Sequence, residues 1–261
     1  MDTFDILPFH AGREIVIDAG YLASKRHIIY GLVEADVTRA RELRRIISAR
    51  DKSNISFTAF LVASLARAIA SNPEVQAYKD WRGRLIVFRD VDVVTLIEPQ
   101  QGKVAIPHII RNANRRTVGE ISAEIRSIQA RPKSSEQNSL LVGLAPRLPR
   151  FVRLFFFGLV KKNPHWFKRL EGTAVVTSVG MFGKSGGWGL GFLPTHTLGL
   201  TVGGITKKPG VHEGQIDIRE YLNITLSFDH DIVDGAPAAR FTRKLIDLIE
   251  LATLLEEALA E

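Results

Sequence analysis

Stretches with strand-like alternation and stretches with helical spacing follow one another along this chain. Apolar patterning predicts strands over 28–38, 85–88, 91–98, 103–110, 172–180, 196–205 and 219–230. Apolar residues three and four positions apart predict helices from Thr38, over 57–71, over 117–129 and over 236–260. Because the two types are interleaved without an obvious linker or repeat, we expect one α/β or α+β domain over residues 1–261, with a mixed sheet flanked by helices.

Several helix ends carry their own signals. Thr117, followed three residues later by Glu120, is typical of an N-cap. Asn72-Pro73 should end the helix over 57–71, and Ala236-Pro237 should open the last one.

The chain has 261 residues and no cysteine. This composition excludes disulfide scaffolds, thiolate metal sites and cysteine nucleophiles. No apolar run reaches the roughly 18 residues that a spanning helix needs, and the first residues are not a secretory signal. We therefore expect a cytoplasmic protein.

The positive charge is concentrated in one segment. The net charge is +7, yet residues 131–170 alone contain nine basic groups and one acid. A basic footprint confined to one segment, without a zinc finger or a phosphate loop, argues against nucleic acid as a partner.

The segment Asp229-His230-Asp231-Ile232-Val233-Asp234-Gly235 carries the clearest chemical signal. It lies between a predicted strand and a predicted helix. A histidine at a strand end can be held rigidly while it faces a cleft, and imidazole both takes and returns a proton near neutral pH. The H-x-x-x-D-G spacing favours a catalytic His230 over a buried structural one.

Four separated stretches, in the same order, resemble the catalytic domain of the dihydrolipoamide acyltransferases of 2-oxoacid dehydrogenase complexes. They are LVEADVTRARELR with NPEVQAYKD, the segment 84–125, GTAVVTSVGMFG at 172–183, and NITLSFDHDIVDGAPAARF. The last stretch is also similar to the ending of chloramphenicol acetyltransferase.

The resemblance implies a chloramphenicol acetyltransferase-like homotrimer with active sites at subunit interfaces. His230 would be the general base, and Asp234 would orient the turn by pairing with an arginine, for which Arg13 and Arg26 are candidates. Thr177 would donate to the tetrahedral oxyanion, with Ser178 as the alternative one residue on.

Further expectations concern the substrates, a metal and the other histidines. Coenzyme A would be a substrate, an acyl-CoA the donor, and a thiol or hydroxyl compound the acceptor. We expect no metal, since the sequence offers no ligand cluster, and a lipoyl group only if it is supplied in trans. Of the other histidines, we expect His196 to be structural, whereas His27 and His108 are weak candidates for lining a channel.

Three features depart from the family pattern. Asp231 stands where an arginine usually follows the histidine, Gly235 being retained, and no lipoyl or subunit-binding domain is apparent. A basic, apolar insertion replaces a short loop at about 135–170, with an apolar helix over 151–160. For its basic part, residues 147–169, three interpretations stay open: packing within the trimer, contact with a membrane surface as a peripheral protein, and an acyl or partner site.

The leading functional hypothesis is therefore a free-standing, CoA-dependent acyltransferase that uses direct transfer. The first alternative is a dihydrolipoamide acyltransferase core served by a separate lipoyl protein. The second alternative is a non-catalytic trimeric scaffold.

Overall fold

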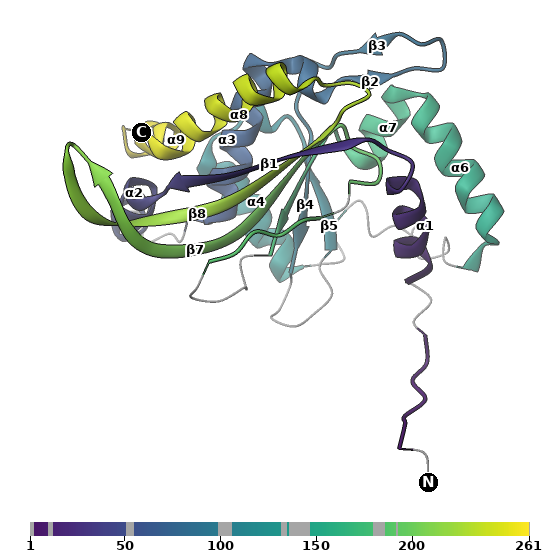
Figure 1. Ribbon diagram of the computed structural model, residues 1–261, viewed down its shortest axis with the longest axis horizontal. Helices are drawn as coiled ribbons and strands as arrows, with labels where there is room; N and C mark the ends of the chain where they lie inside the picture. Colours follow the sequence, from purple (N-terminus) through teal and green to yellow (C-terminus); the bar gives the residue numbers. More distant parts are fainter. Residues whose placement is uncertain are drawn as a thin grey trace.

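Six strands form one mixed sheet in the computed structural model, which describes residues 3–9, 13–50, 55–98, 106–131, 135, 147–179, 186–191 and 193–260. The strand order is β1 (Ile28–Asp36), β8 (Gln215–Asp229), β7 (Leu198–His212), β6 (Ala174–Ser178), β4 (Val93–Ile97) and β5 (Ile106–Ile110). β6 runs parallel to both of its neighbours, and the other pairs are antiparallel (Figure 1). A separate small sheet pairs β2 (Tyr78–Lys79) with β3 (Leu85–Ile86).

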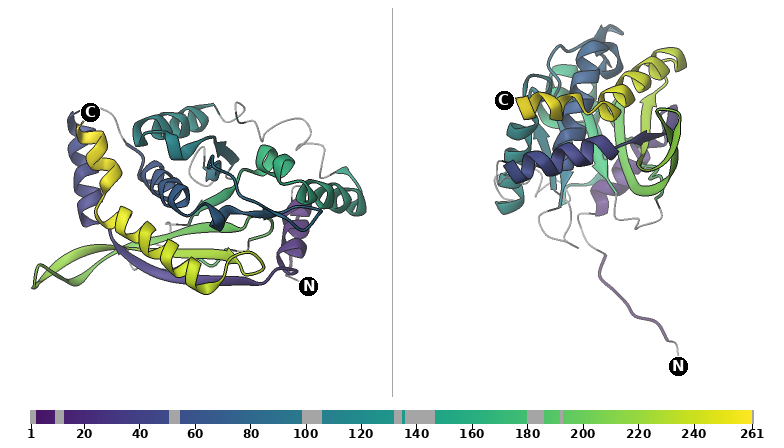
Figure 2. Two further views of the ribbon diagram at one scale, coloured as in Figure 1. Left: turned by 90° about the horizontal axis from the view of Figure 1, so that it is seen from above. Right: turned by 90° about the vertical axis from the view of Figure 1, so that its left-hand side faces the viewer.

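One face of the large sheet is covered by helices, as the views of Figures 1 and 2 show. The covering helices are α2 (Thr38–Arg50), α3 (Phe57–Ser71), α4 (Val118–Ala130), α8 (Gly235–Glu250) and α9 (Thr253–Ala260). Alternate strand residues such as Leu200, Ile224 and Leu226 join Phe60 and Phe241 of the helices in one buried cluster. The predicted two-layer arrangement of helices on a mixed sheet is thus confirmed.

The predicted helix ends of α3 and α4 are found in the structure. Ser56 caps α3 through its side chain, and α3 ends before Asn72. Thr117 and Glu120 form a reciprocal capping box at the start of α4, which satisfies two backbone N–H groups that the helix itself leaves free.

Several predicted elements have different limits in the structure; the strand predicted over 196–205, for example, continues to His212 as β7. β8 begins at Gln215, because a tight turn at Glu213-Gly214, with φ of +50° and +79°, joins it to β7 in a long projecting hairpin (Figure 1). The helix predicted over 236–260 is divided into α8 and α9, since Ala252 adopts a left-handed φ of +53°.

Three further helices lie at the end of the sheet where β1 begins (Figure 1). They are α1 (Arg13–Ala23), α6 (Arg150–Lys162), which includes the predicted helix over 151–160, and α7 (Pro164–Glu171). Val160 and Phe167 from α6 and α7 pack on Tyr78 and Phe88. None of the helices in the described part of the chain has the length and hydropathy needed to cross a bilayer.

Candidate active site

His230 is the first residue after β8, where the chain turns toward α8. Its backbone N–H donates to the carbonyl of His27 at 2.7 Å, and the N–H of Val233 donates back to the Asp229 carbonyl at 2.9 Å. These bonds hold the turn against the start of β1, while 45% of the His230 side chain remains exposed. The structure thus gives this imidazole a fixed backbone and an accessible ring.

Asp234 faces His230 across the turn, and no arginine among the described residues pairs with it, contrary to our expectation. The nearest oxygen of Asp234 is 3.9 Å from Nδ1 of His230, and 84% of the Asp234 side chain is exposed. Arg26 instead forms an ion pair with Asp229, with only 4% and 9% of the two side chains exposed. No ion pair of Arg13 is seen among the described residues. Of the two candidate arginines, Arg26 thus pairs with Asp229 in this chain, because Arg26 precedes β1 and meets the last residue of β8 directly beside it.

Asp231 is paired with a histidine rather than with an arginine. Its carboxylate lies 2.9 Å from Nδ1 of His27, and both side chains are exposed. The hydrogen bond and the charge of Asp231 raise the pKa of His27, and the same hydrogen bond lowers the pKa of Asp231. His27 therefore forms part of the outer rim of the His230 turn.

Lys161, at the end of α6, is close enough to this turn to feel its charges. Burial lowers its pKa, as does the positive charge of Arg26, whereas Asp229 and Asp231 act in the opposite direction. Sequence reasoning missed both Lys161 and the Arg26–Asp229 pair, since neither belongs to a recognisable motif.

The two candidate oxyanion donors lie elsewhere on the sheet. Thr177 and Ser178 end β6, with Thr177 half-buried and Ser178 exposed. Thr177 pairs in register with Thr201 of β7, which pairs with Thr225 of β8. Neighbours of these threonines along each strand point into the helix-covered core, so the threonine row lies on the opposite face of the sheet.

Within one chain, this row cannot reach His230. Thr225 precedes His230 by five residues in β8, which is about 17 Å at about 3.3 Å per residue. Thr177 lies two strands further across the sheet, which adds roughly 10 Å in the perpendicular direction. The structure places the candidate base and the candidate oxyanion donors in different parts of the monomer.

Both parts contain buried polar atoms without partners among the described residues. At the turn these atoms are Nε and Nη1 of Arg26, and on the threonine face they are Oγ1 of Thr225 and Oδ1 of Asn223. Buried polar atoms that make no hydrogen bond are costly.

Gly235 begins α8, and a Cβ atom at this position would meet nothing within 4 Å. Packing within this chain therefore does not explain a glycine here. On the opposite sheet face, a Cβ at Gly189 would lie 2.4 Å from Val179 and 3.0 Å from Thr201, so the segment 186–191 passes directly over the strands.

His196 and His108 have structural surroundings. His196 is buried, donates from Nε2 to the carbonyl of Glu171 at 2.8 Å and packs edge-on against Phe167. Burial lowers its pKa to about 4. His108 is also buried and lies 2.7 Å from Glu124 of α4, so it packs between strand and helix rather than at the His230 turn.

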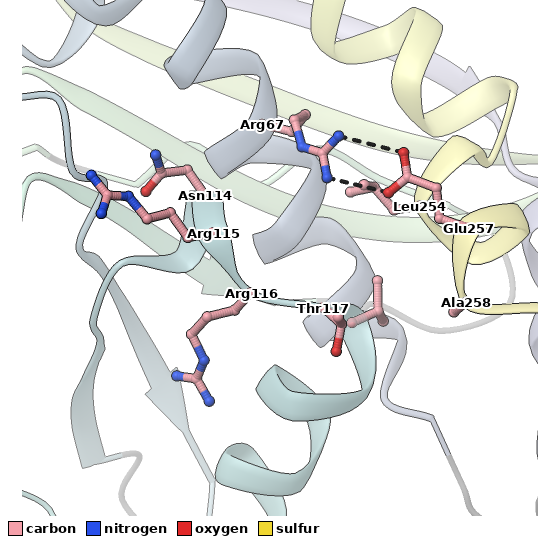
Figure 3. Close-up of a pocket in the computed structure, with 9 residues that line it drawn as sticks. Arg67, Asn114, Arg115, Arg116, Thr117, Leu254, Glu257 and Ala258 are labelled. Atoms are coloured by element: carbon pink, nitrogen blue, oxygen red, sulfur yellow. Dashed lines mark hydrogen bonds and ion pairs between the residues drawn. The ribbon is translucent and has the colours of Figure 1, made fainter. Parts of the chain in front are cut away.

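A cavity of about 280 Å³ lies between α3, α4 and α9 (Figure 3). Three arginines line it, and each is paired with a carboxylate: Arg67 with Glu257, Arg115 with Asp90 and Arg116 with Glu124. None of the lining residues belongs to the His230 turn. Within the described residues there is also no cluster of three or more metal-ligating side chains.

The fold and these motifs define an acyltransferase domain. The sequence model of "2-oxoacid dehydrogenases acyltransferase (catalytic domain)" matches residues 21–139 and 167–256. The chain therefore belongs to this family, and residues 140–166 lie outside the match.

Individual relatives agree with this assignment. The chain is 24% identical over 261 residues to the dihydrolipoyllysine-residue acetyltransferase component of the pyruvate dehydrogenase complex of Rickettsia conorii, covering 97% of this chain and 55% of the relative. The chain thus spans about half the length of the curated relative that it matches.

Solved structures confirm the fold. The Azotobacter vinelandii dihydrolipoamide acetyltransferase superimposes with a TM-score of 0.71 at 19% identity, covering 97% of this chain and 94% of that one. A chloramphenicol acetyltransferase gives a TM-score of 0.53 at 14% identity, with 95% and 99% covered. The predicted chloramphenicol acetyltransferase-like fold is confirmed.

Proposed function

We propose that this chain is the catalytic domain of a CoA-dependent acyltransferase that transfers an acyl group directly between coenzyme A and a thiol or hydroxyl acceptor. The observation that carries the proposal is the fixed, exposed His230 in the H-x-x-x-D-G turn of a family member. Nδ1 of His230 faces Asp234, which leaves Nε2 for the substrate.

In the proposed reaction, Nε2 of His230 removes the proton from the acceptor, and the acceptor sulfur or oxygen attacks the thioester carbonyl carbon of the acyl-CoA. The hydroxyl of Thr177 or Ser178 donates a hydrogen bond to the oxyanion that forms. The tetrahedral intermediate then breaks its bond to the CoA sulfur, and the CoA thiolate takes the proton back from the imidazolium. Loss of one oxyanion donor typically costs about 3–4 kcal/mol of transition-state stabilisation.

The solved Azotobacter enzyme supports these roles. Its crystallographic study concerns a serine, a histidine and an asparagine in the catalytic mechanism, with the asparagine four residues after the histidine and the serine 52 residues before it. In this chain, Asp234 follows His230 by four residues and Ser178 precedes it by 52. This spacing favours Ser178 alongside Thr177 as the donor.

A complete site would need two copies of the chain, because one chain keeps His230 and the threonine row apart. A homotrimer in which the turn of one subunit meets the threonine face of the next would bring them together.

The test combines binding and turnover. Calorimetry should show CoA and acetyl-CoA binding to the wild type and to His230→Ala, while acetyl transfer to dihydrolipoamide falls by at least about a thousandfold in the variant. Dihydrolipoamide also addresses the first alternative, a lipoyl group from a separate protein. A well-folded wild type that binds neither CoA compound would overturn the proposal and favour the non-catalytic scaffold.

A further inference from the structure

Helix α6 turns its charged side toward the protein. Arg153 is only 5% exposed; its Nε donates to Asp18 of α1 at 2.6 Å and its Nη2 to Glu14 at 3.1 Å. Arg150 adds a bond to Asp18 at 3.2 Å. These ion pairs hold α6 on α1, the helix that leads to Arg26 and His27.

The apolar side of α6 points outward. We call Phe151, Phe155, Phe156 and Leu159 the phenylalanine face; these side chains are 74%, 70%, 58% and 43% exposed. Their spacing of four, one and three residues places them on one side of a helix. Trp166 and Leu170 of α7, 57% and 46% exposed, extend the apolar surface. A helix in water normally buries such a face, so its exposure points to a partner.

The charges around the face specify the chemistry of that partner. Every ionised side chain from residue 137 to residue 170 is basic. Arg147, Lys162 and Arg169 are exposed. A surface of phenylalanine and tryptophan flanked by these cations matches the interface of a bilayer that contains anionic lipids.

The same face of a second copy of the chain fits less well. Two such faces in contact would bring two strongly positive surfaces together, which electrostatic repulsion opposes. Residues 140–166 also lie outside the family match, so the phenylalanine face is not part of the shared acyltransferase fold.

We propose that the phenylalanine face of α6, together with the exposed part of α7, docks on the surface of anionic membranes. The helix has 13 residues and lies along the surface, with its aromatic side chains among the headgroups and its cations at the lipid phosphates. This binding is independent of the proposed acyl transfer.

Vesicle flotation tests the docking. The probes are vesicles of phosphatidylcholine alone and of equal parts phosphatidylcholine and phosphatidylglycerol. The wild type should float with the anionic vesicles, less so as salt is raised, and Phe151→Ser/Phe155→Ser should lower the partition coefficient by about tenfold or more. The triple variant Arg147→Gln/Lys162→Gln/Arg169→Gln should reduce binding to anionic vesicles by at least about tenfold.

The matched control is Phe4→Ser/Phe9→Ser, which removes two phenylalanines that are 69% and 67% exposed but lie outside the basic segment. This control should bind vesicles like the wild type, and His230→Ala should do the same. Circular dichroism and light scattering report the fold and the mass of each variant. Three results would overturn the proposal: no flotation of the wild type, equal flotation of Phe151→Ser/Phe155→Ser, or a loss of oligomeric mass in that variant without any vesicle binding.

Discussion

Arg26 and Asp229 form a nearly buried ion pair, and Asp229 directly precedes His230, the proposed general base. Removing one partner of a buried pair leaves the other charge uncompensated and typically costs about 3–5 kcal/mol. We expect Asp229→Asn to lower the free energy of unfolding by about that amount in urea titrations. Asp247→Asn is the control, because the Arg243–Asp247 pair is 82% and 46% exposed and should change stability by less than about 1 kcal/mol. Equal effects of the two variants would contradict the buried pair.

Glu171 and His196 are joined by a hydrogen bond, and burial shifts their pKa values in opposite directions. Burial raises the pKa of Glu171 to about 7 and lowers that of His196 to about 4. Between about pH 4.5 and 7, Glu171 therefore binds a proton in the folded state but not in the unfolded state. The free energy of unfolding consequently falls as the pH rises through that window. His196 becomes protonated below about pH 6.5 in the unfolded state, but only near pH 4 in the folded state. The free energy of unfolding consequently falls as the pH drops from 6.5 toward 4.

Single variants should separate these two effects between pH 4.5 and 6.5. Relative to the wild type, the unfolding free energy of Glu171→Gln should rise with pH, by up to about 1.4 kcal/mol per pH unit. That of His196→Gln should fall with pH relative to the wild type. Urea unfolding at several pH values measures both slopes, and parallel curves for all three proteins would show that neither shift exists.

Single residues also show where sequence reasoning reached its limit. His230 and Asp234 could be found because their spacing carries chemistry that few other residues offer. The partner of Asp229 could not be identified, because pairing depends on how β1 and β8 lie side by side, 203 residues apart in the chain. The distance between His230 and Thr177 likewise follows from the strand order and not from their motifs.

At the scale of elements, α3 and α4 could be predicted within a residue or two because apolar spacing and capping residues agree. α1 could not be predicted, because its one fully buried side chain is Asp18, which an apolar period does not mark. The break between α8 and α9 has no glycine or proline to signal it, since Ala252 takes the left-handed conformation.

The attachment of α6 to α1 depends on Arg153 and Asp18, whose side chains are 4% and 0% exposed. Arg153→Leu should destabilise this helix pair strongly, since Arg150 alone would face the Asp18 carboxylate. Hydrogen exchange of the α1 and α6 amides should accelerate in this variant while β7 and β8 stay protected. Arg153→Leu/Asp18→Leu should recover much of the protection, because an apolar pair replaces both charges. Faster exchange in the double variant than in the single one would contradict this account.

At the scale of the whole molecule, the central question is whether one active site combines two chains. The monomer keeps the His230 turn and the Thr177 face roughly 20 Å apart. A site at the interface between subunits would therefore take its base from one chain and its oxyanion donor from the next.

Mixed trimers test this arrangement directly. His230→Ala keeps the oxyanion donors, and Thr177→Ala/Ser178→Ala keeps the base, so each homotrimer alone should be nearly inactive. Unfolding and refolding a one-to-one mixture distributes the chains at random, and about one interface in four then joins an intact base to an intact donor. The mixture should recover about a quarter of the wild-type acetyl transfer, provided that light scattering shows the wild-type mass. Homotrimers refolded separately and then mixed serve as the control and should stay inactive. An inactive co-refolded mixture of normal mass would mean that base and donor must belong to the same chain.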